Sequence, residues 1–158
     1  MIIKNEIFLE KLSLEHLDDM YEYSKNIDFR KALSLNKKYT KEDAKDFLKF
    51  LINENKTGKR DYYFIMKNGK AIGTIGLLCI KDYEAEVGFG IAREYWGHNI
   101  AGICLDEISK IFFNKYPSFK RLLIGTNLKN KRTQNFALKH SYIECKRTDT
   151  HVYFSLSR

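Results

Sequence analysis

The residues best suited to binding an anion lie in the segment YWGHNIAG, residues 95–102, between a β-like run and an amphipathic one. A turn that ends a strand and opens a helix leaves backbone N–H groups unpaired. Together with the helix dipole, these groups bind a phosphate or diphosphate. Gly97 tolerates any backbone conformation, and Asn99 enters the left-handed region more readily than most residues. Ala101 is small enough to let a diphosphate lie on the backbone, and His98 offers a donor. The segment predicts a diphosphate-binding turn with Asn99 where a glycine is expected.

The preceding run, EAEVGFGI at 84–91, combines carboxylates with positions that carry no side chain. Strand alternation puts Ala85, Val87, Phe89 and Ile91 on one face and Glu84, Glu86, Gly88 and Gly90 on the other. Glycines inside a strand often mark the close approach of a ligand, which makes Glu86 a candidate site residue beside bare backbone. The alternative is that the glycines make room for a helix packed on the sheet and that Glu86 is solvated.

Other reactive side chains fit structural roles better. Cys79, Cys104 and Cys145 are odd in number and lie in apolar or strand-like surroundings, so we expect buried or half-buried thiols and no disulfide framework. Cys104 has no neighbour that would lower its pKa, which argues against a covalent acyl-enzyme. The four histidines show no metal-ligand spacing, so we expect no metal.

The elements that must position these residues follow from hydrophobic periodicity and turn signals. We expect a strand at 6–12, a helix from Leu14 capped by Ser13, and a second helix capped by Thr40 with Asp43. The second helix should bury Ala44, Phe47, Leu48 and Leu51. Segment 26–39 has no clean period. Asn68-Gly69 predicts a tight hairpin after residue 61. Strand 84–92, a helix from Ile100, strand 119–126, a helix at 130–140 and strands at 142–146 and 151–156 complete the chain.

Length and composition bound the fold class. The chain has 158 residues, 44% of them hydrophobic, which suits a single domain over 1–158 that buries roughly 70% of its unfolded surface. The strand–helix–strand unit at 84–126 implies one parallel pair in an otherwise antiparallel sheet. We therefore expect an α+β fold of about seven strands and about four helices. No apolar run could cross a bilayer and the start does not suit a signal peptide, so we expect a cytoplasmic protein with no membrane partner.

The net charge of +8 attracts anions such as nucleic acid, acidic lipid or a phosphorylated small molecule. Its basic residues are spread along the chain, whereas nucleic-acid binding favours a clustered stripe, so we expect no specific nucleic-acid partner.

Four motifs resemble the GCN5-related N-acetyltransferase (GNAT) superfamily, in particular its ribosomal-protein-alanine acetyltransferase (Rim) branch. WGHNIA at 96–101 is similar to the acetyl-CoA loop Q/R-x-x-G-x-G/A, often YWGxGxA in that branch, with Asn99 at the first glycine. TKEDAKDFL at 40–48 and AEVGFGIAREYW at 85–96 resemble the second helix and the strand before the loop. Asn130 and Thr133 resemble N-x-x-S, after which Ser141-Tyr142 replaces the usual G-F pair.

The resemblance implies the GNAT fold, with a sheet splayed between its fourth and fifth strands at 84–92 and 119–126. Acetyl-CoA would be the acyl donor, with pantetheine in the gap and its amides paired with backbone near Phe89, Gly90 and Ile91. The diphosphate would lie on the N–H groups of the loop, and Asn130 and Thr133 would contact the pantetheine or adenosine end. The loop residues implied are Trp96, Gly97, His98, Asn99, Ile100, Ala101 and Gly102. The alternative for Asn130 and Thr133 is a helix-capping pair.

The implied activity is transfer of an acetyl group to a primary amine by direct attack in a ternary complex. The amine must lose a proton before it attacks. We expect Glu86 to be the base, with Glu84 or an ordered-water route as alternatives. A backbone N–H near Phe89 or Gly90 would stabilise the oxyanion. The tyrosine that protonates the thiolate in many relatives is replaced by Ala137, which leaves Tyr142 or solvent.

The acceptor is not specified by the sequence. A protein N-terminus, an amino sugar or nucleotide-linked amino sugar, and a small amine all stay open, as does a homodimer. Arg30, Lys31, Lys37 and Lys38 would form a basic entrance favouring an acidic acceptor, or only a solvated face. The alternative functions are a catalytically degenerate acetyl-CoA-binding module and a basic nucleic-acid-binding protein.

Overall fold

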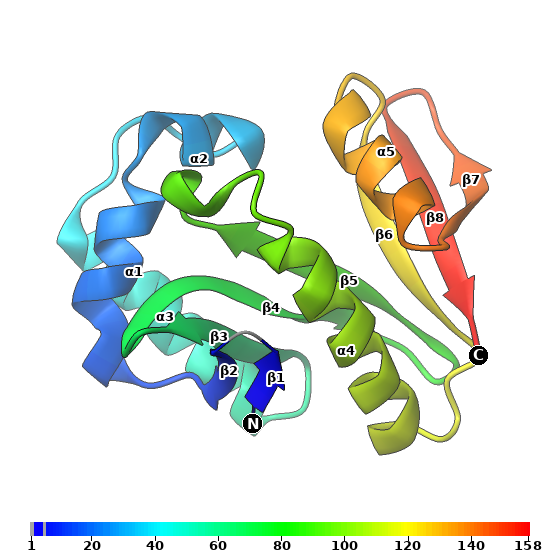
Figure 1. The fold of residues 1–158 in the computed structure, drawn as a ribbon, viewed down its shortest axis with the longest axis horizontal. Helices are drawn as coiled ribbons and strands as arrows, with labels where there is room; N and C mark the ends of the chain where they lie inside the picture. The colour runs from blue at the N-terminus through cyan, green and yellow to red at the C-terminus, as the bar shows by residue number, and fades with distance from the viewer. Residues whose placement is uncertain (1, 5) are drawn as a thin grey trace.

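The structure of the chain, a computed structural model, describes residues 2–4 and 6–158 (Figure 1). Its helices are α1 (Leu17–Ser24), α2 (Ile27–Ala32), α3 (Lys41–Lys56), α4 (Ile100–Lys115) and α5 (Lys131–Lys139). Its strands are β1 (Ile2–Lys4), β2 (Ile7–Lys11), β3 (Asp61–Lys67), β4 (Lys70–Ile80), β5 (Glu84–Ile91), β6 (Arg121–Asn127), β7 (Ile143–Arg147) and β8 (His151–Ser157). Short 3₁₀ turns at Leu14–His16 and Arg93–Tyr95 precede α1 and the loop before α4.

All the strands belong to one mixed sheet in the order β1-β2-β3-β4-β5-β6-β8-β7. Only β5 and β6 run parallel, and α4 forms the crossover between them. The other neighbours are antiparallel, which confirms the expected mixed, mostly antiparallel α+β fold. The sequence patterns missed β1, a three-residue strand paired with β2, and α2, which lies in the segment without a clean period.

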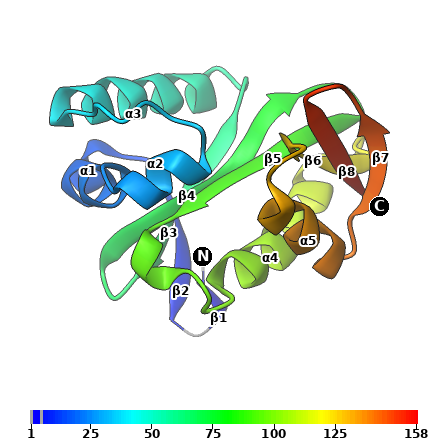
Figure 2. The ribbon, with the colours of Figure 1, turned by 90° about the horizontal axis from the view of Figure 1, so that it is seen from above.

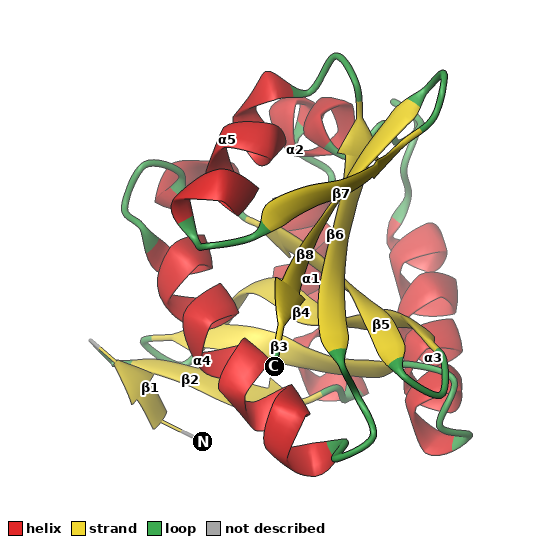
Figure 3. Cartoon of the chain, turned by 90° about the vertical axis from the view of Figure 1, so that its right-hand side faces the viewer, coloured by secondary structure: helices red, strands yellow, loops and turns green. Residues whose placement is uncertain are grey.

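The parallel pair is joined at one end only. The ladder between β5 and β6 consists of Glu84↔Arg121, Ala85↔Leu122 and Glu86↔Leu123. Both strands continue beyond these pairs, to Ile91 and Asn127, but they diverge (Figure 1, Figure 3). The expected splay between these two strands is therefore present.

Helices cover both faces of the sheet. Helices α1 and α3 lie on one face and α4 and α5 on the other, as the view from above shows (Figure 2). The core under α1 to α3 includes Met20, Phe29, Leu48, Leu51, Tyr62 and Phe64. The core under α4 and α5 includes Ile65, Ile75, Val87, Cys104, Leu105, Ile108, Phe112, Leu122, Ile124 and Phe154. The second core takes residues from both sides of the splay, so one continuous core joins the two parts of the sheet.

Local sequence signals explain most element ends. Thr40 and Asp43 form the expected capping box at the start of α3, with reciprocal side-chain to backbone hydrogen bonds. Asn68 and Gly69 have φ of 50° and 75°, as a tight hairpin turn requires. Ser13 makes no capping hydrogen bond, contrary to expectation. Phe47 is 48% exposed and lines a cleft, so its expected burial on α3 is wrong. Within the described residues, none of the helices is both long and apolar enough to span a membrane.

Candidate functional site

A cleft of about 1750 Å³ opens where β5 and β6 separate. It collects site residues that the sequence analysis drew from three separate segments. The predicted residues that line it are Glu86, Phe89, Gly90, Ile91, Trp96, Gly97, Asn99, Ile100, Ala101, Gly102, Asn130 and Thr133. His98, the remaining predicted residue, is exposed on the loop and does not line the cleft.

The loop before α4 has the geometry that an anion site needs. Gly97 and Asn99 both take left-handed backbone conformations, with φ of 82° and 58°. Asn99 is the N-cap residue of α4, although its side chain makes no capping hydrogen bond. The first N–H groups of a helix have no intrahelical acceptor, and they carry the positive end of the helix dipole. Asn99 thus adopts the conformation that the expected glycine would adopt, and the start of α4 faces the cleft.

Trp96 connects the two sides of this cleft. Its Nε1–H donates to the carbonyl of Ile91 at 2.9 Å, which anchors the loop to the end of β5. The guanidinium of Arg132, on α5, lies 4.3 Å from the centroid of the indole, and that of Arg93 lies 4.7 Å from it. Cation–π contacts of this kind stabilise by about 0.5–2 kcal/mol. Arg132 was not predicted from the sequence, because it is 36 positions from Trp96 and no local pattern links the two.

Asn130 serves as the N-cap of α5. Its Oδ1 accepts a hydrogen bond from the backbone N–H of Thr133 at 3.1 Å, as in the capping alternative. Both residues also line the cleft. The two roles are compatible, because the cap uses the amide oxygen of Asn130 and leaves its NH₂ group for a ligand.

The two candidate bases have different surroundings. The carboxylate of Glu84 accepts a hydrogen bond from Arg121 Nε at 2.6 Å and does not line the cleft. Glu86 lines the cleft, and its Oε1 lies over Gly125 of β6. Burial raises the pKa of Glu86, while His151 and Lys81 act in the opposite direction. A half-buried carboxylate with a raised pKa suits proton transfer, so Glu86 is a better candidate for the general base than Glu84.

The glycine face of β5 is not bare, contrary to the sequence interpretation. A Cβ on Gly90 would lie 3.0 Å from the ring of Phe29, on α2. A Cβ on Gly88 would collide with the hydroxyl oxygen of Tyr62, on β3. Gly90 therefore makes room for a packed helix, as the alternative held. Gly88 makes room for a phenol that the sequence analysis did not single out.

Tyr62 reaches Gly88 by crossing β4. A Cβ on Gly76, which pairs with both Tyr62 and Gly88, would meet the Tyr62 Cγ at 2.7 Å, so the ring lies over Gly76. Tyr62 lines the cleft, and burial raises the pKa of its phenol, followed by the smaller effects of Arg60 and Glu86. The phenol thus keeps its proton at neutral pH, and its hydroxyl is available as a hydrogen-bond donor. Two glycines opposite a strand tyrosine could have indicated this arrangement, but only once the register was known.

Tyr142 is not placed to act as the acid, and Cys104 is not placed to act as a nucleophile. Tyr142 is 2% exposed, its hydroxyl pairs with Ser109 Oγ at 3.2 Å, and it does not line the cleft, so it cannot supply the acid. Burial raises the pKa of Cys104 to about 12, so this thiol is a poor nucleophile. The three cysteines are free, but Cys79 and Cys145 are exposed and not buried or half-buried as expected.

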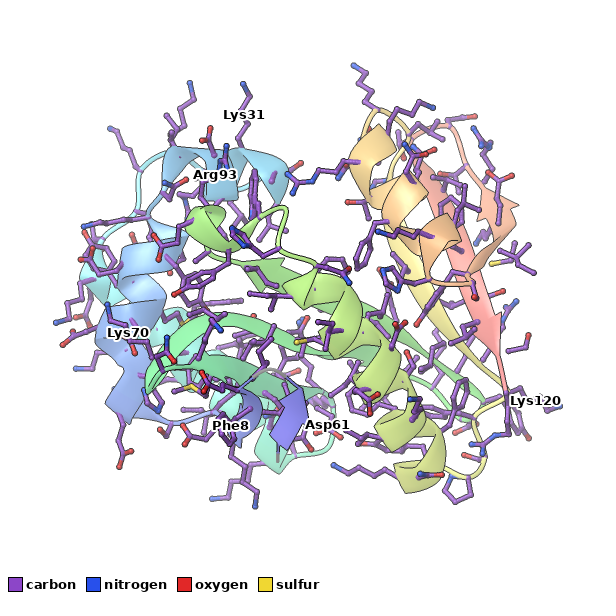
Figure 4. All side chains as sticks on the ribbon, in the orientation of Figure 1. Phe8, Lys31, Asp61, Lys70, Arg93 and Lys120 are labelled. Carbon is purple, nitrogen blue, oxygen red and sulfur yellow. The ribbon has the colours of Figure 1, made fainter. Side chains whose placement is uncertain are left out.

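The expected basic entrance is only partly present. Arg30 is 6% exposed, donates to the carbonyls of Ser24 and Asn36 and stacks on the ring of Tyr39 at 3.9 Å. It therefore holds the segment after α2 in place and is not an entrance charge. Lys31 is exposed and projects outward from α2 (Figure 4). Lys31 and Lys38 line the cleft, whereas Lys37 lines a neighbouring depression on α2.

Cations outnumber acids around the cleft as a whole. Its lining includes Arg30, Lys31, Lys38, Arg60, Lys129, Arg132 and Lys139. Among the described residues, its acidic side chains are Asp43 and Glu86. The field in the cleft therefore favours anionic ligands.

The family model described as Acetyltransferase (GNAT) domain matches residues 6–141. No protein of curated function is significantly similar to the chain in sequence. Among solved structures, a ribosomal L7/L12 alpha-N-protein acetyltransferase, RimL, in its apo form has a TM-score of 0.89 at 12% identity, covering 99% of this chain and 93% of that one. The microcin C7 self-immunity acetyltransferase MccE in complex with acetyl-CoA and AMP has a TM-score of 0.84 at 18% identity, covering 99% and 94%.

A chimera of the spermidine N-acetyltransferase SpeG from Vibrio cholerae and hSSAT has a TM-score of 0.79 at 11% identity, covering 97% of this chain and 96% of that one. At identities of 11–18%, these similarities show that the chain shares the fold of the solved structures.

Proposed function

Because this chain belongs to the GNAT acetyltransferase family, we propose that it transfers the acetyl group of acetyl-CoA to a primary amine by direct attack in a ternary complex. The observation that carries this proposal is the cleft between β5 and β6. It has a left-handed turn and a helix N-terminus at one end and the half-buried Glu86 at the other.

In this proposal, acetyl-CoA fills the splay. The pantetheine amides pair with the backbone of Phe89, Gly90 and Ile91, where β5 has left its partner. The diphosphate lies on the N–H groups of residues 97–102. Asn130 and Thr133 contact the pantetheine or the adenosine end of the cofactor. Arg132, held against Trp96 on the rim, adds positive charge near the phosphates.

The acceptor ammonium loses one proton to Glu86, its lone pair attacks the thioester carbon, and the cationic nitrogen of the tetrahedral intermediate releases a second proton to water. A backbone N–H near Phe89 or Gly90 stabilises the oxyanion of the tetrahedral intermediate. Collapse of the intermediate breaks the C–S bond, and the leaving thiolate takes the proton of the Tyr62 hydroxyl. That hydroxyl lies beside Gly88, two residues from Glu86 on the same face of β5. Glu86 then returns its proton to the tyrosinate through water, so the amine proton ends on the thiol.

The charge of the cleft bears on the acceptor. The cations around it disfavour a polyamine and favour an amine that also carries an anionic group, such as a nucleotide-linked amino sugar or the N-terminus of an acidic protein.

The test has two parts. Thermal-shift and calorimetric titration with acetyl-CoA measure donor binding, and CoA release is then followed over acidic peptides, amino sugars, nucleotide-linked amino sugars and spermidine. CoA is best quantified by chromatography, because the exposed thiols of Cys79 and Cys145 would consume a thiol reagent. We expect stabilisation by acetyl-CoA and acceptor-dependent CoA release. Absence of acetyl-CoA binding contradicts the proposal, whereas binding without turnover on any amine supports a degenerate binding module.

A further inference from the structure

His140 is a buried polar side chain with one nitrogen left over. Its side chain is 8% exposed, and its Nδ1 lies 2.9 Å from Asp106 Oδ1, on α4. Its Nε2 is buried and has no hydrogen-bond partner within residues 2–4 and 6–158. An unpartnered buried polar atom costs roughly 1–3 kcal/mol, so such an atom calls for an explanation.

The orphan nitrogen is aimed at the start of α4. A Cβ on Gly102, in the first turn of that helix, would lie 2.5 Å from His140 Nε2 and also 2.5 Å from the carboxamide oxygen of Asn99. The imidazole and the carboxamide therefore both border the place where Gly102 carries no side chain. Asn99, Gly102 and Asp106 follow one another at helical spacing on one side of α4, and His140 ends α5 opposite them.

The chemistry of the three groups fixes what each can do. An ionised Asp106 only accepts hydrogen bonds, so His140 Nδ1 must donate to it. In the neutral imidazole, Nε2 is then an acceptor. A half-turn of the Asn99 carboxamide exchanges its oxygen and its NH₂ group, which puts the NH₂ group beside the place at Gly102 that His140 Nε2 also borders. One N–H is used by His140, and the second is free at the N-terminus of the helix, where the diphosphate is proposed to bind.

We propose that Asp106, His140 and Asn99 form a relay that holds the Asn99 amide as a donor to the diphosphate of acetyl-CoA. Asn99 occupies a glycine position of the acetyl-CoA loop. The relay would explain this substitution, because a carboxamide at this position can be held by His140. His140 and Asp106 act through Asn99, so they are positioning residues. The inference rests on the proposed use of acetyl-CoA.

The experiment measures the dissociation constant of CoA by calorimetry for the full chain and its variants. His140→Leu keeps the bulk and removes Nε2, whereas the amide of His140→Gln can reach the Nε2 position. Asn99→Gly removes the carboxamide, costs no capping hydrogen bond and suits the local φ of 58°. It is therefore the variant that stays informative if His140→Leu folds poorly.

We expect His140→Leu and Asn99→Gly each to weaken CoA binding about 3- to 10-fold, the worth of one neutral hydrogen bond. The double variant should lose no more than either single variant, and His140→Gln should retain most of the affinity. His16 is the matched control, because it is another mostly buried imidazole bound to a carboxylate, at 2.6 Å from Glu10, but lies outside the cleft. His16→Leu should leave the affinity unchanged.

A spectroscopic readout separates positioning from a general effect on folding. The ¹⁵N resonances of His140 in labelled wild-type protein should show Nδ1 protonated with and without CoA. Nε2 should move toward a hydrogen-bonded acceptor when CoA is added. Additive losses in the double variant, or CoA affinity unchanged in His140→Leu and Asn99→Gly, would overturn the relay while leaving the acetyl-CoA site intact. If wild-type protein fails to bind CoA, the proposed function falls and the relay falls with it.

Discussion

The carboxylate of Glu86, on β5, lies over Gly125, on β6, so that its Oε1 is 2.9 Å from the place that a Cβ on Gly125 would take. The ring of Tyr153 lies against the same place at 2.7 Å. Gly125, on one side of the splay, thus makes room for the carboxylate of Glu86, on the other side. The position of Glu86 depends on a residue that carries no functional group.

Replacement of Glu86 by glutamine tests the base. We expect Glu86→Gln to lower turnover with the best acceptor by about 10²-fold or more and to leave the Kd for CoA within about twofold. In wild type, turnover should fall as pH decreases through the pKa of Glu86, because only the carboxylate accepts a proton. Burial raises that pKa, so the acidic limb should lie above the usual range for glutamate and disappear in Glu86→Gln. Equal losses in turnover and in CoA affinity would indicate a structural role.

The same pKa shift predicts a stability change of defined sign. A carboxyl whose pKa is raised by folding favours the folded state when it is protonated, and it loses this contribution as pH rises through its folded pKa. Glu86→Gln should therefore melt at or above the wild-type temperature at neutral pH. The difference should vanish in acid. Thermal denaturation at several pH values measures it, and a lower melting temperature at neutral pH contradicts the assignment.

Replacement of Gly125 by alanine tests the placement of Glu86. The new methyl group would collide with both the carboxylate and the Tyr153 ring, so we expect turnover to fall by up to about 10²-fold while CoA still binds. The double variant Glu86→Gln/Gly125→Ala is the control, and it should be no slower than Glu86→Gln alone. A further loss in the double variant would show that alanine harms something other than the base.

Replacement of Tyr62 by phenylalanine tests the proton donor. We expect Tyr62→Phe to reduce turnover about 10-fold or more, since water is a poorer acid in this half-enclosed place, and to leave the fold intact. Tyr63→Phe is the matched control, because Tyr63 is the next residue on the opposite face of β3, with its hydroxyl 3.5 Å from Lys115 Nζ, and does not line the cleft. If the two variants have equal turnover, Tyr62 is not the acid.

Removal of the cap of α3 should affect stability alone. Thr40→Ala deletes the side chain that accepts from Asp43 N, and such caps contribute about 1 kcal/mol to the free energy of unfolding. Thr57→Ala, at the other end of the same helix, should change that free energy by less than about 0.5 kcal/mol. Urea denaturation gives both values. A change in CoA affinity in Thr40→Ala would be inconsistent with a purely local role.

Much of the fold was predictable because its signals are local. The capping box at Thr40, the Asn68-Gly69 turn and the alternation along β5 each depend on residues within a few positions of one another. Short elements were missed because a three-residue strand or a six-residue helix has no period to detect. Phe47 follows the helical pattern of α3 but faces the cleft, which the pattern cannot distinguish from core.

The site was predictable only in part, because its remaining contacts join distant segments. The loop at 95–102 was found from its own residues. The phenol of Tyr62 over Gly88, the stack of Arg132 on Trp96 and the pairing of His140 with Asp106 each depend on how strands and helices are placed in space. Arg30 shows the converse, since a residue that looks like a free surface charge is enclosed by backbone carbonyls.

Three residue pairs join β5 to β6, and the apolar side of α4 packs in the core that extends across the splay. A change of volume at the buried Ile108 or Phe112 is therefore expected to shift the strands on which the walls of the cleft are built. The packing of the interior and the width of the cleft thus depend on some of the same side chains.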